Sequence, residues 1–255
     1  MRTSLMRTLA LAALLGIAAC QTAATQTPAP TASSANIVAA IADTARPKAD
    51  TDLDADRKPA EMLAFAGAAP GMKVGELIPS GGYMTRIFSK AIGPTGKLYL
   101  LNGPAAAGRT LGFQGILDDK ANYPNATFVQ TDFLTIATPE PLDLVWTSQN
   151  YHDMHNPGRN LDINAANKAI FNALKPGGVY IVLDHVAAPG VAFNATIHRI
   201  DPAMVKGEVL AAGFEYVGES NALRNPADPH DKTVFDPSIR HKTDQFMMKF
   251  RKPAK

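Results

Sequence analysis

The stretch Val74–Arg86, with the sequence VGELIPSGGYMTR, decides the expected fold. It starts as an apolar, strand-like run, and the residues PSGG at 79–82 then break the strand. Apolar residues recur at helical spacing over 83–92, so a helix is expected directly after the break. Glycines at such a bend let a backbone approach a ligand closely, and a helix N-terminus presents free N–H groups. The stretch predicts either a strand–turn–helix unit with a ligand site or an ordinary turn.

Strand-like runs and helical patterns alternate along the rest of the chain. Strands are expected at 72–78, 97–101, 126–130, 142–147, 179–184, 214–219 and 245–250. Helices are expected at 59–68, 83–92, 111–122, 163–174 and 202–212. The alternation predicts an α/β fold with a mostly parallel sheet and helices on both faces. Only the polar loop 220–244 separates the last two strands, so these are expected to be antiparallel, with the loop acting as a lid or as a surface loop fixed by ion pairs.

The first twenty residues resemble a bacterial secretion signal. Arg2 and Arg7 precede an uncharged Ala/Leu-rich run that is too short to span a membrane. The run ends in Ile17-Ala18-Ala19-Cys20, which resembles the lipobox of bacterial lipoproteins, where the Cys is lipidated. In that family, Gln21 after the Cys implies sorting to the outer membrane, facing the periplasm. Alternatively, the segment is a plain secretory signal and Cys20 is incidental.

Composition shifts divide the chain into three parts. Residues 1–19 form the expected signal peptide. Residues 20–45 are expected to be a flexible linker, rich in Thr, Ala and Pro, with a short helix at 37–42. Residues 46–255 form the expected folded domain.

Composition also excludes several classes of protein. Apolar residues make up 46 % of the chain, which excludes an intrinsically disordered protein. The chain has 25 Lys and Arg against 23 Asp and Glu, and the two Arg of 1–19 account for the difference. The balance excludes a nucleic-acid binder with a basic face. A single Cys excludes a disulfide framework, and the scattered His residues lack a zinc motif, so no metal site is expected.

Polar residues follow three of the expected strands. Asn102, Asp132 and the segment 148–153 (SQNYHD) each come directly after a strand. Because ligands of open parallel sheets bind beyond the carboxyl ends of the strands, these residues are expected to face one crevice. His185 follows another strand and is expected at the rim of the crevice. Arg199 is a candidate partner for an anionic substrate.

The chain resembles the class I S-adenosylmethionine-dependent methyltransferases and, more narrowly, a bacterial family of predicted methyltransferases. The resemblance extends from about Arg46 to the C-terminus. It rests on five segments: ELIPSGGYMTRIF, DLVWTSQNYHDMHN, ALKPGGVYIVLDH, HRIDPAMVKGEVLAAGF and FDPSIRHKTDQFMMKFRKP. It implies a Rossmann-like, seven-stranded, mostly parallel sheet with a C-terminal antiparallel hairpin. It also implies S-adenosylmethionine as cofactor and a small-molecule acceptor.

The family's cofactor motif, acid-x-Gly-x-Gly-x-Gly, is only partly present. Glu76 and Gly82 match it, whereas Ile78 and Ser80 stand where glycines are usual. Asn102 takes the position of the acid that binds the ribose. Asp132 matches the acid at the adenine, with a simple turn residue as the alternative. The resemblance implies cofactor contacts at Glu76, Ser80, Gly81, Gly82, Tyr83, Asn102, Asp132, Phe133 and Asn150.

The segment after the fourth strand lines the methyl-transfer site in this family. Methyl transfer is an in-line displacement that needs positioning and sometimes a base. His152 is the candidate base, Asp153 its orienting partner and Tyr151 a cap over the substrate. Alternatively, Tyr151 and His152 pack against the following helix and Asp153 is the N-cap of that helix.

Two functions remain open from the sequence. One is an S-adenosylmethionine-dependent methyltransferase that acts on an unidentified small molecule. The other is a non-catalytic ligand-binding or envelope-structural lipoprotein on a degenerate methyltransferase fold. The second alternative is motivated by the predicted export, because the cofactor is not ordinarily supplied outside the cytoplasm. No oligomeric interface is identifiable.

Overall fold

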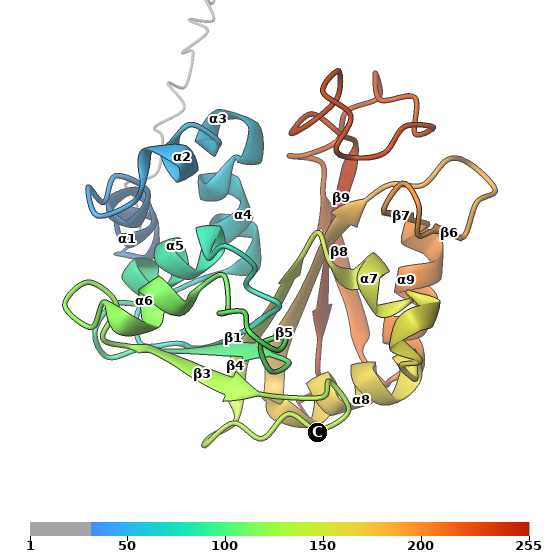
Figure 1. Cartoon of the computed structure of the whole chain (residues 1–255). Helices are drawn as coiled ribbons and strands as arrows, with labels where there is room; N and C mark the ends of the chain where they lie inside the picture. Colours follow the sequence, from blue (N-terminus) through green and yellow to red (C-terminus); the bar gives the residue numbers. More distant parts are fainter. Residues whose placement is uncertain (1–31, 255) are drawn as a thin grey trace, which may run out of the picture.

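A seven-stranded sheet forms the centre of the computed structural model, which describes residues 32–254 (Figure 1). The strand order is β3-β2-β1-β4-β5-β9-β8. The strands are β1 (Lys73–Leu77), β2 (Lys97–Asn102), β3 (Ala126–Gln130), β4 (Leu142–Ser148), β5 (Leu174–His185), β8 (Glu215–Ser220) and β9 (Gln245–Arg251). The strands β1 to β5 are parallel, and β9 runs antiparallel to both β5 and β8. The expected mostly parallel sheet with a C-terminal antiparallel hairpin is confirmed.

Nine α-helices surround the sheet within the described residues. They are α1 (Ala32–Ile41), α2 (Lys48–Thr51), α3 (Asp54–Arg57), α4 (Pro59–Ala66), α5 (Tyr83–Ala91), α6 (Gln114–Asp118), α7 (Tyr151–Met154), α8 (Ile163–Ala173) and α9 (Pro202–Ala211). A 3₁₀ turn covers Pro157–Arg159. Two short strands, β6 (Phe193–Asn194) and β7 (Arg199–Ile200), form a separate antiparallel pair that the sequence patterns did not predict.

Each face of the sheet carries its own apolar core. On one face, α1, α4, α5 and α6 bury side chains such as Met62 and Ile87. On the other face, α7, α8 and α9 bury side chains such as Ile170 and Val205 (Figure 1). Burial on both faces is the usual arrangement of a parallel sheet and explains the apolar runs at 144–146 in β4 and at 179–183 in β5.

Helix α1 packs against the domain. It contacts α4 and α5, and its Ile37 and Ala40 are buried in the first core. The packed region therefore begins upstream of Arg46, where the domain was expected to start. The physical reason is the apolar IVAAIA segment at 37–42, because its burial against α5 removes apolar surface from water and stabilises the fold.

Strand β5 begins earlier than expected. The residues KPGG at 175–178 lie between the helix expected at 163–174 and the strand expected at 179–184, and the structure includes them in β5 with a register shift against β4. The N–H of Gly177 donates to the carbonyl of Lys252, and the N–H of Lys252 donates to the carbonyl of Gly178. These two bonds extend the antiparallel pairing beyond β9, which a local pattern cannot reveal.

The segment 221–244 between β8 and β9 is held by buried charges. The guanidinium group of Arg199 is fully buried and donates to both carboxylate oxygens of Asp228, at 2.9 and 3.0 Å. It also donates to the carbonyls of Val186 and Lys232. Arg199 is therefore a structural residue, and the expected pairing with an anionic substrate is wrong. Of the two expectations for the loop 220–244, a lid or a surface loop fixed by ion pairs, the structure agrees with the second.

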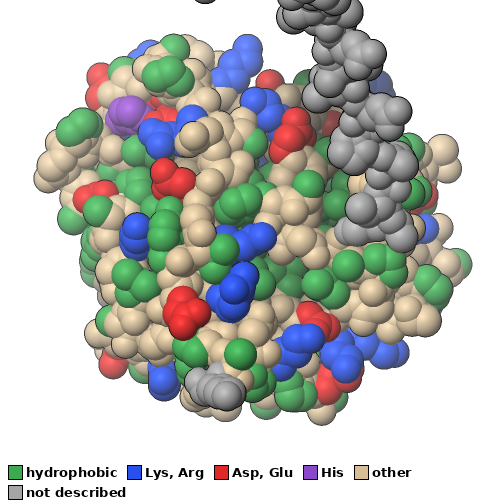
Figure 2. Space-filling view, turned by 180° about the vertical axis from the view of Figure 1, so that it is seen from behind, with side chains coloured by type: hydrophobic (Ala, Val, Ile, Leu, Met, Phe, Trp, Pro, Cys, Tyr) green, Lys and Arg blue, Asp and Glu red, His purple; other side chains and the backbone are tan. Residues whose placement is uncertain are grey.

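The surface carries charges of both signs. On the face shown in Figure 2, basic and acidic side chains are interspersed over the described residues. Within residues 32–254, the helices are too short or too polar to cross a membrane.

Candidate functional site

The turn after β1 has an unusual backbone. Ile78 and Ser80 have φ angles of 51° and 53°, and Gly82 has a φ of 80°. These are the three positions where the methyltransferase pattern has glycine. The backbone therefore keeps the left-handed conformations that glycine favours, although two of the three residues carry side chains.

Gly82 is required at the end of this turn. It is the N-cap of α5, and a Cβ atom at this position would collide with the side chain of Ile116. The turn is also tied to the neighbouring helices, because Arg86 donates to the carbonyl of Gly81 and to the carboxylate of Asp50. Packing thus fixes the turn from both sides.

A cavity of about 290 Å³ lies at the carboxyl ends of β1 and β4. This volume is at the lower end of the roughly 300–1,000 Å³ typical of small-molecule sites. Its walls are the turn after β1, the end of β4 and the segment that contains α2 and α3. Five of the residues expected to bind the cofactor line it: Glu76, Ser80, Gly81, Tyr83 and Asn150.

Glu76 lies at the base of the cavity. Its side chain is buried, and one carboxyl oxygen accepts a hydrogen bond of 2.6 Å from the hydroxyl group of Thr85. Burial raises the pKa of Glu76 to about 8, against the smaller opposing effects of Thr85 and Arg86. Near pH 7 the carboxyl group is therefore largely protonated and can donate a hydrogen bond to a ligand.

Asn150 joins the two central strands beneath the cavity. Its side-chain oxygen accepts from the hydroxyl group of Thr147, and its amide nitrogen lies 3.3 and 3.2 Å from the carbonyls of Leu77 and Ile78. These bonds hold the end of β4 against the turn after β1. Asn150 thus shapes the cavity wall.

Arg57 is a cavity residue that the sequence patterns missed. It lies in α3, and its guanidinium group stacks over the ring of Tyr83 at 4.5 Å. Its Nε atom is buried and has no hydrogen-bond partner within residues 32–254, and burial lowers the pKa of this side chain. The hydroxyl group of Tyr83 donates to Asp54 at 2.6 Å, which anchors α3 over the cavity. Nothing in the charged segment 46–58 distinguished this Arg from its neighbours.

Four expected cofactor residues do not line the cavity: Gly82, which caps α5, and Asn102, Asp132 and Phe133. The side-chain amide of Asn102 donates to the carbonyl of Gly103. One carboxylate oxygen of Asp132 accepts from the backbone N–H groups of Leu134 and Thr135, both at 2.9 Å. Asp132 therefore has the turn role that was the alternative. Phe133 packs partly buried against the second core.

Tyr151 is a core residue. It is fully buried, and its hydroxyl group donates to Glu208 and accepts from the side chain of Asn167, both at 2.8 Å. Burial and the nearby Glu208 raise the pKa of Tyr151. Its side chain packs among α7, α8 and α9, so it does not have the position expected of a cap over a substrate.

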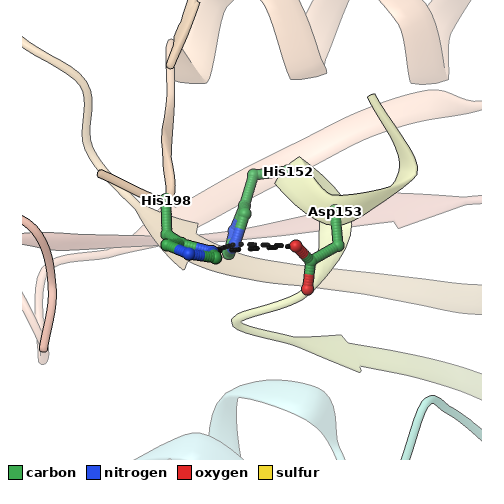
Figure 3. Close-up of side chains that lie close together, drawn as sticks. All are labelled: His152, Asp153 and His198. Carbon is green, nitrogen blue, oxygen red and sulfur yellow. Dashed lines mark hydrogen bonds and ion pairs between the residues drawn. The ribbon is translucent and has the colours of Figure 1, made fainter. Parts of the chain in front are cut away.

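His152 is oriented by Asp184, a residue that the sequence analysis did not single out. The Nδ1 atom of His152 lies 2.7 Å from one oxygen of Asp184, and its backbone N–H donates to the other oxygen. Asp153, the expected orienting partner, lies instead on the other side of the ring, 3.5 Å from Nε2 (Figure 3). The sequence pattern could have identified Asp184, because this residue lies at the end of an expected strand, as Asn102 and Asp132 do.

His185 does not reach the rim. It is buried and its Nδ1 atom lies 2.8 Å from the hydroxyl group of Thr243. Burial lowers the pKa of His185 to about 4, so its imidazole is neutral near pH 7. Cys20, the expected lipidation site, lies outside the described residues.

Comparisons with known proteins point to one fold. No family model matches the chain. The chain is 26 % identical over 186 residues to the ubiquinone/menaquinone biosynthesis C-methyltransferase UbiE from Shewanella sp. (strain W3-18-1), with 68 % of each chain covered.

Solved structures with a similar fold include further methyltransferases. The [4+2]-cyclase SpnF aligns with a TM-score of 0.59 at 16 % identity, over 89 % of this chain and 98 % of its own. A putative sarcosine dimethylglycine methyltransferase from Galdieria sulphuraria aligns with a TM-score of 0.57 at 16 % identity, over 80 % and 88 %. The strand order, the turn after β1 and these similarities identify the fold of this chain as that of the class I S-adenosylmethionine-dependent methyltransferases.

Proposed function

We propose that this protein is an S-adenosylmethionine-dependent methyltransferase with a small-molecule acceptor. The observation that carries the proposal is the cavity beneath the turn after β1, at the carboxyl ends of β1 and β4. In open parallel sheets this is where ligands bind. The similarity to UbiE, a C-methyltransferase by name, supports the activity.

The residues of the cavity suit such a cofactor. Arg57 lines the cavity with a guanidinium group, whose N–H donors suit a carboxylate group, and the protonated Glu76 offers a further donor. The turn brings its backbone close to the cavity at Ser80 and Gly81. The cofactor would supply the activated methyl group, and these side chains would position it for in-line displacement.

A second candidate function rests on the departures of this chain from the cofactor pattern of the methyltransferases. Asn102 and Asp132 make local bonds, and Ile78 and Ser80 replace two glycines of the family pattern. The fold also serves other chemistry, since SpnF is a [4+2]-cyclase. These observations favour a binding protein on a degenerate methyltransferase fold.

Calorimetric titration of the purified chain with S-adenosylmethionine separates the two candidates. We expect micromolar binding that weakens about tenfold or more in Arg57→Gln, about 1.4 kcal/mol per tenfold change. Asp132→Ala is the matched control and should bind as the wild type does, because Asp132 lies outside the cavity. No heat from a folded protein at millimolar cofactor would overturn the methyltransferase proposal and favour the binding protein.

We also propose that the protein is exported and lipid-anchored through Cys20 in the outer membrane, facing the periplasm. The support is the sequence of residues 1–21 alone. An acyl-anchored protein needs no membrane-spanning helix, because acyl chains supply the membrane affinity.

A further inference from the structure

We propose that His152, Asp153 and His198 form a binding site for a divalent transition-metal ion. The ligand atoms would be Nε2 of His152, Nδ1 of His198 and one carboxylate oxygen of Asp153. The two nitrogen atoms lie 3.1 Å apart, and the Asp153 oxygen lies 3.5 and 3.7 Å from them (Figure 3). All three atoms lie within 4.8 Å of one another. A bound ion would take the place of the proton that the two imidazoles share.

These separations are those of ligands around a small metal ion. Zinc binds His nitrogen and carboxylate oxygen at roughly 2.0–2.2 Å, so two ligands of a tetrahedral site are about 3.4 Å apart. The observed distances bracket this value. Two imidazoles and one carboxylate suit zinc, iron, cobalt and manganese ions, whereas Mg²⁺ and Ca²⁺ prefer oxygen ligands alone.

Asp184 holds His152 in the state that a metal ligand needs. When Nδ1 of His152 donates to the fully buried Asp184, the lone pair of Nε2 faces His198 and Asp153. A metal-bound His usually donates its other N–H to a carboxylate in this way, which orients the ring and increases its basicity. The backbone N–H groups of His152 and His185 also donate to Asp184, so its own position is fixed.

His198 reaches the cluster from a distant part of the chain. It lies just before β7, and its φ angle of 58° is uncommon for a residue with a side chain. Its ring packs edge-on against Phe235 at 4.9 Å and against His152 at 5.2 Å. Strained backbone of this kind persists where the surrounding structure enforces it, often at functional sites.

The site is open on one side. His152 is almost fully buried, whereas the side chains of His198 and Asp153 are 32 % and 34 % exposed. Three protein ligands leave at least one coordination position for water or for an oxygen or nitrogen atom of a ligand, as in catalytic rather than structural zinc sites. The site lies two residues beyond Asn150, which lines the cavity. The proposal departs from the expectation of no metal site, because His198 joins His152 and Asp153 only through the tertiary structure.

Cobalt(II) binding tests the proposal directly. The purified chain is freed of metal with a chelator and titrated with Co²⁺, with calorimetry and the visible d–d absorption as readouts. We expect one equivalent to bind with a micromolar dissociation constant and to produce a d–d band. Zn²⁺ should displace the cobalt and remove the band.

Three variants assign the ligands. His198→Ala and Asp153→Asn change partly exposed side chains and should each weaken Co²⁺ binding about tenfold or more, with the fold preserved by circular dichroism. His155→Ala is the matched control, because His155 lies one turn beyond His152 and contacts Glu208 instead. It should bind Co²⁺ as the wild type does.

Two results would overturn the metal site. One is the absence of Co²⁺ and Zn²⁺ binding to the folded wild type. The other is equal Co²⁺ affinity in His198→Ala, His155→Ala and the wild type. The proposal is independent of the cofactor: S-adenosylmethionine titration of metal-free protein reports on the methyltransferase proposal alone.

Discussion

Ser80 and Ile78 hold glycine-like conformations without being glycine. Their φ angles are 53° and 51°, and Arg86 fixes the turn by bonding to the carbonyl of Gly81. A left-handed conformation costs a residue with a Cβ atom roughly 1–2 kcal/mol. The turn therefore stores strain at the wall of the cavity, and the surrounding packing maintains it.

Replacing Ser80 with glycine should release part of this strain. Ser80 is exposed and its hydroxyl group makes only a 3.3 Å bond to the carbonyl of Ile78, so little is lost with the side chain. Glycine also increases the conformational entropy of the unfolded chain, which offsets part of the gain. We therefore expect Ser80→Gly to raise the free energy of unfolding by about 0.5–1 kcal/mol. Ser80→Ala keeps the Cβ atom and should bring no gain. Denaturant unfolding compares the two; equal stabilities would contradict the strain.

At the scale of elements, the long connection between β8 and β9 depends on one buried ion pair. Asp228 accepts from Arg199 and from the backbone N–H groups of His230 and Asp244. It thereby joins the loop to β7 and to the beginning of β9. A second carboxylate, that of Asp244, binds Arg224 and His230 at the same end of the loop.

Removing the carboxylate of Asp228 should destabilise the protein strongly. Asp228→Asn leaves the guanidinium group of Arg199 buried without its counter-charge, which costs about 3–5 kcal/mol. Asp231→Asn makes the same chemical change at an exposed site of the loop and should alter stability by less than about 0.5 kcal/mol. Urea unfolding measures both. A loss below about 1 kcal/mol in Asp228→Asn would mean that the pair does not hold the loop.

At the scale of the whole molecule, the cavity and the His152 cluster lie beyond the carboxyl ends of β1 and β4. The proposed lipid anchor would attach the domain to a membrane through residues 20–31. The cofactor must then be supplied outside the cytoplasm. The location of the protein is therefore central to its proposed activity.

Lipidation at Cys20 is testable in a bacterial host. The full chain, labelled metabolically with a fatty acid that carries a chemical handle, should incorporate the label and sediment with membranes. Cys20→Ser should lose both properties, and because Cys20 is the only Cys of the chain, no other thiol can take the label. An unlabelled wild-type chain would contradict the lipoprotein proposal and favour a plain secretory signal.

Local patterns predicted most of the elements. The strands at β3 and β4 and the helices at α5, α8 and α9 begin where the periodicity and the turn residues placed them. Their starts could be predicted because the spacing of apolar residues, the helix caps and the glycine-containing turns are each encoded within a few consecutive residues. Five cavity residues were expected instead from the resemblance to the methyltransferase family: Glu76, Ser80, Gly81, Tyr83 and Asn150.

The sequence by itself thus determined the alternation of strands and helices, the turn after β1 and the signal-like N-terminus. Only the tertiary structure decided which polar residues meet. Asp184 and His198 approach His152 from positions 32 and 46 residues away, and Arg57 reaches the cavity from a helix that precedes the sheet. The same packing turned Arg199 and Tyr151 into buried structural residues. Side-chain partners across such separations depend on the strand order and on how the loops pack, and local periodicity carries no information on either.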